Sequence, residues 1–183
     1  AYDESGYSVS LSGNGNTVVI GAPYNDANGS NSGHVRIYEN INGGWVQIGQ
    51  DIDGEDYGDF SGTSVSLSAD GSTLAIGAFQ ANDINGSING HVRVYENNGG
   101  TWVQIGQDID GEASGDQSGN SVSLSSDGNT VAIGAPYNDG NGTDAGHVRV
   151  YEICSPGCTD PLATNFDPTA TFDDGTCYYT CLI

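Results

Sequence analysis

The chain has 183 residues and a formal net charge of -21, with 24 acidic and only 3 basic residues. Nucleic-acid phosphates and anionic membranes bind clustered lysines and arginines, so this composition disfavours both as partners. An acidic surface with so little counter-charge favours cations instead, either bound divalent ions or screening salt. Hydrophobic residues make up 36% of the chain in a regular pattern, which argues against disorder.

One sequence unit occurs three times and organises most of the chain. His34 and His91 are 57 residues apart, and His91 and His147 are 56 apart. A period in this range is typical of β-propellers and solenoids. We therefore expect repeats at about 1–57, 58–114 and 115–152, followed by a C-terminal module at 153–183.

Within each unit, short apolar segments alternate with polar residues, which is the periodicity of β-strands. In the second unit the strands are expected at residues 64–68, 73–78, 91–96 and 102–107. The first two are joined by Asp70-Gly71, and Asn14-Gly15 and Asp127-Gly128 stand at the matching places. These dipeptides accept the positive φ of a tight hairpin, so each complete unit is predicted to be a four-stranded antiparallel meander.

We expect Val, Leu and Ile on one face of this meander, and Ser, Ala, Gly, His, Arg and Tyr on the other. A sheet with one branched face and one small-residue face can stack on its neighbour, large against small, as propeller blades do. The predicted fold class is therefore all-β with propeller-like blades. Sheets arranged in a sandwich or a solenoid are the alternative.

Three segments of the first unit carry a family resemblance. The stretches at 5–12 (SGYSVSLS), 18–26 (VVIGAPYND) and 33–39 (GHVRIYE) resemble the FG-GAP repeat of integrin α-subunit propellers and related bacterial surface proteins. The likeness spans about residues 3–152 and implies propeller blades. Short hairpins replace the calcium-binding segment that the family places between its first two strands, so the resemblance carries no calcium site over to that position.

The third unit ends after Glu152, without a counterpart to the fourth-strand segments that begin at Trp45 and Trp102. Three blades, one of them incomplete, do not close a propeller, which normally needs at least four. Either the chain is a fragment, or other copies close its open edges. Exposed strand edges pair with other chains, so we predict self-association into an oligomer or filament.

Side chains that could suggest an active site recur with the repeat. His34, His91 and His147 occupy one position of the unit, and we expect each to hydrogen-bond to the adjacent unit. The arginines at 36, 93 and 149 are each expected to pair with a carboxylate such as Glu39, Glu96 or Glu152, or with an aspartate that joins the blades. Trp45 and Trp102 are expected to be packing anchors. No nucleophile with a base breaks the repeat, so we expect no catalytic residues and no enzyme.

Acidic segments join one unit to the next. Carboxylates at alternate positions beside glycine suit calcium. The candidate ligands are Asp51, Asp53 and Glu55 at the first junction and Asp108, Asp110 and Glu112 at the second. A solvated acidic turn without metal is the equally weighted alternative.

The loop after the second strand repeats an Asn-Gly-Ser/Thr sequence at Asn28, Asn85 and Asn141. This pattern is the acceptor for N-linked glycans and is expected in exposed loops of secreted proteins. Such an Asp-x-Asn-x-Ser run can also ligate calcium, and Asn-Gly is ordinary turn chemistry. Glycan or ion binding is slightly favoured over a bare turn.

The C-terminal segment, residues 157–177, resembles a short Cys-bounded, Asp-rich module of secreted Bacteroidetes-type surface proteins. A piece this small needs a staple, and four cysteines allow three pairings. We expect the nested one, Cys158 with Cys177 and Cys154 with Cys181. Calcium could bind there, or the acidic loop could be metal-free, with zinc as a weaker alternative. The candidate ligands are Asp160, Asn165, Asp167, Asp173 and Asp174.

The cysteines suggest an oxidising compartment, no stretch is long enough for a transmembrane helix, and Ala1 is expected to be a processed N-terminus. The predicted function is an extracellular or cell-surface structural or adhesive protein that binds copies of itself. The alternatives are a calcium-dependent monomeric adhesin for carbohydrate or protein, and a fragment of a polysaccharide-active propeller enzyme.

Overall fold

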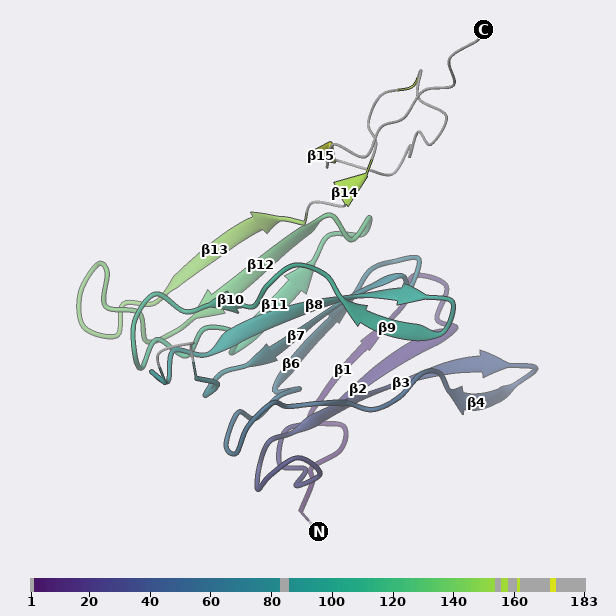
Figure 1. Ribbon diagram of the computed structural model, residues 1–183, viewed down its shortest axis with the longest axis horizontal. Helices are drawn as coiled ribbons and strands as arrows, with labels where there is room; N and C mark the ends of the chain where they lie inside the picture. Colours follow the sequence, from purple (N-terminus) through teal and green to yellow (C-terminus); the bar gives the residue numbers. More distant parts are fainter. Residues whose placement is uncertain (1, 83–85, 154–155, 158–160, 162–171, 174–183) are drawn as a thin grey trace, which may run out of the picture. The chain divides into compact units, whose positions relative to one another are not determined.

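The computed structural model describes residues 2–82, 86–153, 156–157, 161 and 172–173 (Figure 1). The chain divides into two compact units, residues 1–151 and 152–183. All regular secondary structure in the described residues is β. Those residues include no helix with the length and apolar character needed to cross a membrane.

The first blade has strand order β1-β2-β3-β4, and a further short strand, β5, also pairs with β3. β4 pairs with the second half of β3, from Tyr38 to Ile41, whereas β5 pairs with its beginning, at His34 and Val35. The outer position is thus shared by two short strands. The bounds are β1 Ser8–Leu11, β2 Thr17–Ala22, β3 His34–Ile41, β4 Gly44–Gln47 and β5 Ile52–Asp53.

The second blade repeats this arrangement, and the third has three strands in the described residues, β11-β12-β13. The predicted all-β fold of antiparallel blades is confirmed, and the third blade has no fourth strand among these residues. The bounds are β6 Ser64–Leu67, β7 Thr73–Ala78, β8 His91–Asn98, β9 Thr101–Gln104, β10 Ile109–Asp110, β11 Ser121–Leu124, β12 Thr130–Ala135 and β13 His147–Glu152. In the C-terminal unit, β14 Pro156–Gly157 pairs in parallel with β15 Phe172–Asp173.

The tight hairpins form where Asn-Gly and Asp-Gly predict them. Gly71 has a φ of 79°, and the carboxylate of Asp70 accepts hydrogen bonds from the Ser68 hydroxyl at 2.7 Å and the Ser72 backbone N–H at 3.0 Å. The predicted fourth strand, by contrast, is too long. β9 ends at Gln104, Gly106 has a φ of 73°, and the backbone re-enters the sheet as β10, in a segment expected to be a turn.

The strand register corrects the predicted faces. Residues opposite one another in an antiparallel pair project to the same side of the sheet. Val18 lies opposite Tyr38 and Ile20 opposite Arg36, so Arg and Tyr lie on the face opposite to Ser and Gly, and branched residues occur on both faces. We call the face of Arg and Tyr the leading face. In the first blade it comprises Val9, Leu11, Val18, Ile20, Arg36, Tyr38 and Trp45.

The opposite side, the trailing face, comprises Ser8, Ser10, Val19, Gly21, Val35 and Ile37 in the first blade. The leading face of the second blade packs on it, and one buried cluster results, with Ile37, Leu74 and Ile76 at its centre. The first strands of successive units, β1, β6 and β11, lie next to one another (Figure 1). Each fully buried side chain of this size stabilises the stack by about 1.5–3 kcal/mol.

Candidate functional site

Two joints of the same construction hold the three blades together. The Ser8 hydroxyl donates to the Gly62 carbonyl at 2.7 Å, and the Ser64 hydroxyl donates to the Gly119 carbonyl at 2.7 Å. In each joint the backbone of the later blade approaches a glycine of the earlier one so closely that a Cβ on Gly21 or Gly77 would collide with that carbonyl. Glycine is therefore required at both positions by packing.

Further backbone groups complete each joint. The N–H of Leu67 donates to Ser10 Oγ at 3.0 Å and that of Leu124 to Ser66 Oγ at 2.9 Å. At the hairpin ends, the N–H of Gly13 donates to the carbonyl of Ala69 at 2.7 Å, and the N–H of Ala69 to that of Ser126 at 2.9 Å. The serines of the first strands, which alternate with Val and Leu, are thus the polar component of blade stacking.

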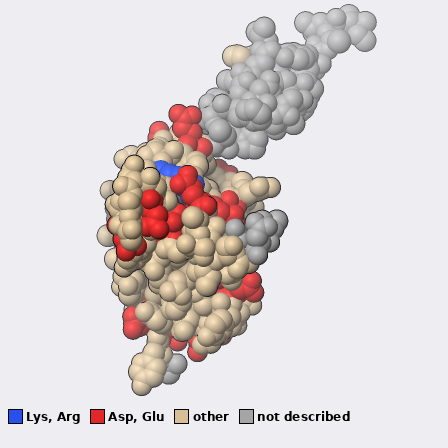
Figure 2. All heavy atoms as spheres, turned by 90° about the vertical axis from the view of Figure 1, so that its left-hand side faces the viewer, with Lys and Arg blue, Asp and Glu red and all other residues tan. Residues whose placement is uncertain are grey.

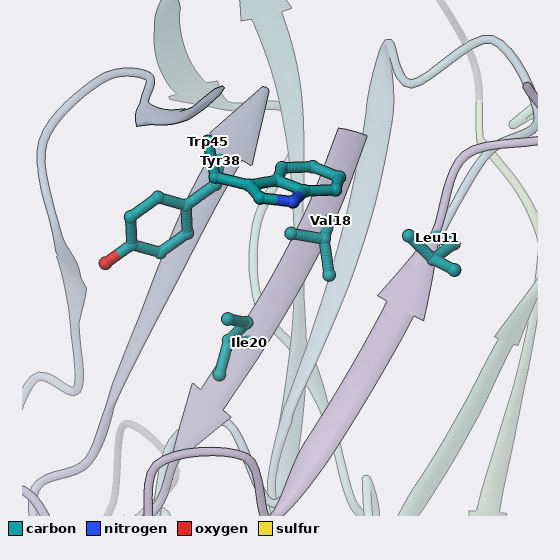
Figure 3. A pocket seen from close by; sticks show the side chains of 5 residues that line it. All are labelled: Leu11, Val18, Ile20, Tyr38 and Trp45. Atoms are coloured by element: carbon teal, nitrogen blue, oxygen red, sulfur yellow. The ribbon is translucent and has the colours of Figure 1, made fainter. Parts of the chain in front are cut away.

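The leading face of the first blade is exposed, although its sequence matches that of the buried second blade. Leu11 is 58% exposed where its counterpart Leu67 is 7% exposed, and Trp45 is 50% exposed where Trp102 is 3% exposed. This face contains a hollow of about 410 Å³. Figure 3 shows its lining: Leu11 from β1, Val18 and Ile20 from β2, Tyr38 from β3 and Trp45 from β4.

The trailing face of the third blade is exposed as well. Val148 on β13 is 67% exposed, whereas its counterpart Val92 is fully buried, and Val150 differs from Val94 in the same way. The opposite face of that blade is covered, because Val131 and Ile133 are buried against the second blade. The blade stack therefore ends in two different apolar surfaces. Both expose residues whose counterparts in the second blade are buried.

The three arginines all pair with acidic junction residues, but only Arg36 pairs with the side chain of a blade-joining aspartate, as one of the two predicted alternatives states. Arg93 reaches back to the first blade, where its Nη2 donates to the Asp53 carbonyl at 3.1 Å and its Nη1 lies 3.2 Å from Glu55 Oε1. Arg149 makes the equivalent contacts with Asp110 and Glu112. On the face shown in Figure 2, acidic side chains gather around a small basic patch.

Arg36 differs because no blade precedes it in the described stack. Its Nε and Nη2 donate to Asp51 Oδ2 of its own blade at 2.9 and 2.7 Å, and its side chain is 42% exposed, against 5% for Arg93. The hydrogen bond from Arg36 lowers the pKa of Asp51. Asp51 Oδ1 also accepts from Gln47 at 2.7 Å, so both oxygens of this carboxylate accept hydrogen bonds.

The histidines begin equivalent strands and do not converge on one site. His91 is buried, with Nδ1 3.5 Å from Asp108 Oδ2. Among the described residues neither of its ring nitrogens has a hydrogen-bond partner, so the expected bond from His91 to the adjacent unit is wrong. Burial lowers the pKa of His91 to about 4, against an opposing effect of Asp108. Its imidazole is therefore neutral at neutral pH.

A group that could hold a metal ion lies in the first blade. The ligand atoms of His34, Asp51 and Asp53, one from each, lie within 4.8 Å of one another. His34 Nδ1 and Asp53 Oδ1 are buried and have no hydrogen-bond partner in the part of the chain that the structure describes. Asp51 and Asp53 belong to the predicted calcium set. The group fits calcium poorly, because calcium takes six to eight oxygen ligands, whereas this one includes an imidazole and a carboxylate already bound by Arg36.

The remaining junction carboxylates lie in separate environments. Glu55 and Glu112 are half-exposed and pair with Arg93 and Arg149, and Asp108 accepts from Gln104 at 2.7 Å. Asp53 and Asp110 lie on β5 and β10. Calcium at these junctions stays a prediction.

Two of the predicted glycosylation asparagines, Asn28 and Asn141, lie in loops between the second and third strands of their units. Asn28 is exposed, and its Nδ2 donates to the carbonyls of Gly54 at 2.8 Å and Glu55 at 3.1 Å, which ties the loop to the junction segment. Asn141 is exposed in the third unit. Asn85 lies outside the described residues.

Most of the predicted C-terminal site lies outside the described residues. This holds for Cys154, Cys158, Cys177 and Cys181, and for Asp160, Asn165, Asp167 and Asp174. Asp173 is the exception and lies on β15. The disulfide pairing and the C-terminal metal site therefore stay predictions.

Comparisons with known proteins agree with the blade architecture. The FG-GAP repeat family matches residues 1–38 and 109–151. Among solved structures, the periplasmic gluconolactonase PpgL of Pseudomonas aeruginosa superposes with a TM-score of 0.51 at 20% identity, over 79% of this chain and 38% of that one. This likeness shows a shared fold.

Two plant proteins match a short part of the sequence. The ribulose bisphosphate carboxylase/oxygenase activase of Arabidopsis thaliana is 51% identical over 53 residues, which are 29% of this chain and 10% of that protein. The activase of Oryza sativa subsp. japonica is 50% identical over 50 residues, 27% of this chain and 10% of that protein. The chain thus spans about a tenth of the length of the curated relatives it matches.

The expectation that the chain is not an enzyme is wrong, because it is inferred from the repetition of the blades. The gluconolactonase shows that an enzyme can have this fold, so repeated blades do not exclude catalysis. The recognition of the repeats themselves is confirmed. The sequence match over residues 1–38 and 109–151 and the stacked antiparallel blades both support the resemblance of these repeats to the FG-GAP repeat.

Proposed function

We propose that this protein is an extracellular repeat protein with a structural or adhesive role, which associates with copies of itself through the surfaces that its terminal blades expose. The FG-GAP repeats and the likeness to a periplasmic protein support a location outside the cytoplasm, at the cell surface or beyond it. Association produces an oligomer or a filament. The blade faces are the binding surfaces, in addition to the strand edges considered from the sequence.

The observation that carries this proposal is the exposure of Leu11 and its neighbours on the leading face of the first blade. The same residue types at the same positions of the second blade are buried in the core. A contiguous apolar surface of this kind is a mark of an interaction site in a soluble protein. Because its counterpart is covered by another blade, a blade is the partner that fits it.

Sedimentation velocity of the full chain over a range of concentrations tests the proposal. The weight-average mass is expected to rise above 18.8 kDa with concentration, because apolar burial drives the association. Leu11→Asp should abolish the increase, since it places a charge in the contact. A mass that stays at 18.8 kDa at all concentrations in the wild type would contradict the proposal.

Val46→Asp is the matched control. Val46 lies on β4 of the same blade, on the trailing side, and is 48% exposed. Its counterpart Val103 is also 48% exposed although it belongs to the covered second blade. Stacking therefore does not bury this position, and Val46→Asp should associate as the wild type does.

Carbohydrate binding is a second candidate function, favoured by a row of aromatic side chains. Tyr7 and Tyr24 lie 6.4 Å apart between ring centroids, and Phe60 follows at 5.3 Å from Tyr24 and 5.3 Å from Phe79. Tyr7 and Tyr24 are exposed, and exposed aromatic rings are the groups on which sugar rings stack. Affinity electrophoresis in gels that contain soluble polysaccharides tests this function. Retardation that Tyr24→Ala removes supports it, and unchanged mobility in all gels contradicts it.

Calcium and glycans are further parts of the proposal. If calcium binds the acidic junctions, the melting temperature should be higher in calcium chloride than in EDTA, and an equal melting temperature would contradict it.

If Asn28, Asn85 and Asn141 are glycosylated in the native host, the intact mass should exceed the sequence mass by hexose-sized additions. An unmodified intact mass would contradict the glycan.

A further inference from the structure

The contact between successive blades is made twice inside the stack. Each end of the stack exposes one of the two surfaces that form this contact. Gly62 and Gly119, which approach the preceding blade, have φ values of 86° and 83°. Gly6 has the same conformation, with a φ of 94°, and its N–H donates to the Gly21 carbonyl at 3.0 Å, just as Gly62 N–H donates to the Gly77 carbonyl at 3.1 Å. A Cβ on Gly6 would nevertheless meet no atom of the described residues within 4 Å. The first blade therefore has the backbone conformation of an inner joint, but no preceding blade of the described residues contacts it there.

The third blade exposes the complementary surface. Gly134 aligns with Gly21 and Gly77, but the three atoms of the described residues nearest to a Cβ placed on it all belong to Ser121 of its own blade, whereas at the inner joints such a Cβ would collide with the next blade. Ser121 and Ser123 align with the serines that bond the next blade at the inner joints, and both are exposed. Val148 and Val150 complete the surface.

We propose that the leading face of the first blade binds the trailing face of the third blade of a second copy, and that two copies close a six-bladed ring. The inference rests on the proposed self-association and specifies its partner surface and its stoichiometry. By analogy with the inner joints, the Ser121 hydroxyl of one copy donates to the Gly6 carbonyl of the other, and Leu11 N–H donates to Ser123 Oγ. The hairpin contact follows as Ser126 N–H to the Gly13 carbonyl.

The stoichiometry follows from the blade count. Propellers close with about four to eight blades. One copy supplies three sheets in its blade unit, so two copies supply six blades and a third copy would exceed the usual range. In a ring of two, both open faces of each copy are covered, and association stops there instead of continuing as a filament.

The new joint is centred on the inner strands, β1 to β3 of one copy and β11 to β13 of the other. At the inner joint, Trp102 is covered partly by the segment after β4, where Gln50 Nε2 donates to the Trp102 carbonyl at 3.4 Å. The third blade has no described counterpart of that segment. Trp45 is therefore expected to be covered less completely than Leu11 and Val18.

Charge opposes this association and gives it a recognisable salt dependence. Each copy carries a net charge of -21, whereas the faces that meet are largely apolar. Screening of the repulsion should strengthen the ring as sodium chloride rises from about 50 to about 500 mM. An association held by ion pairs would weaken over the same range.

The test is sedimentation velocity combined with native mass spectrometry on the full chain and on Gly134→Arg. The wild-type mass should reach a plateau at twice the chain mass. Gly134→Arg should raise the dissociation constant at least about 100-fold, because the new side chain occupies the place of the partner's backbone. Asn98→Arg, which adds the same charge at an exposed position of the covered blade, should leave it unchanged. At a concentration at which the wild type is itself monomeric, circular dichroism should show the same melting curve for the wild type and Gly134→Arg.

Leu11→Asp independently prevents the association from the other surface, the leading face of the first blade. Each variant alone should be monomeric, but a mixture of Leu11→Asp with Gly134→Arg should form a weak dimer, since one intact joint remains between an unblocked first blade and an unblocked third blade. Masses that keep rising beyond two copies would overturn the ring while the proposed self-association stands. A dimer that persists in Gly134→Arg would overturn the assigned faces, and a monomeric wild type would overturn both proposals.

Discussion

The first and second blades present nearly the same residues in different surroundings. Leu67 and Trp102 are core residues, whereas Leu11 and Trp45 lie at the surface, although each pair occupies one position of the repeat. The sequence of a repeat therefore specifies which face is apolar, but the neighbouring blade decides whether that face is buried. Residues at the same position of the repeat therefore contribute different amounts to the free energy of unfolding, depending on the blade in which they lie.

The largest contrast is expected at the glycines of the trailing face. Gly77→Val should cost about 3 kcal/mol or more, because its Cβ would collide with the Gly119 carbonyl and Ser64 Oγ. Gly134→Val should be neutral or slightly stabilising in the monomer, because only the Ser121 side chain must move and valine favours strands. Urea unfolding at low protein concentration measures both. Equal losses would show that the third blade is covered in the same way as the second.

The tryptophans should show the next largest contrast. Trp102→Ala removes a side chain that is 3% exposed and should destabilise the fold by about 3–5 kcal/mol. Trp45→Ala removes one that is 50% exposed and should cost about 1 kcal/mol in the monomer. Thermal unfolding of the two variants under the same conditions decides. If Trp45→Ala were as damaging as Trp102→Ala, the first blade would not be an exposed terminal surface.

A smaller effect concerns pH. Burial holds the pKa of His91 at about 4 in the folded state, below its unfolded value of about 6.5. The unfolded chain therefore binds a proton between these values that the folded chain does not, and stability falls as the pH drops from about 6.5 to about 4. The contribution of His91 is at most about 3 kcal/mol.

His91→Gln isolates this contribution from the carboxylates that titrate in the same range. The slope of the unfolding free energy against pH should be shallower in the variant than in the wild type between pH 6.5 and 4. Asp108 and Arg93 both act on this imidazole and oppose each other, so the wild type must be measured in the same buffers. Identical slopes would show that His91 is not a buried neutral imidazole.

Much of the blade could be predicted from the sequence, because the signals are local. Strand alternation, the positive φ of residues such as Gly71 and the end of the repeat at Glu152 can all be read from short segments of sequence. The faces could not be predicted in the same way. Alternation shows that Arg36 and Tyr38 share a face, but only the pairing of Ile20 with Arg36 shows which face it is.

The candidate binding surfaces depend even more on long-range structure. Ser8 and Gly62 contact each other across 54 residues of sequence, and neither differs in type from its copies. The contrast between Gly77 and Gly134 becomes visible only when the blades are stacked. One sequence signal was available in retrospect, since a glycine precedes the first strand of every unit, at Gly6, Gly62 and Gly119.

Hydrogen exchange read by mass spectrometry, at protein concentrations below and above the association range, tests the central claim most directly. The account predicts that peptides covering β1 and β11 gain protection on association, because they contribute Leu11 and Ser123 to the new joint. The peptide covering β6 should not change, since it is already enclosed between two blades. Exchange in β1 and β11 that is independent of concentration while the mass increases would contradict blade-to-blade stacking.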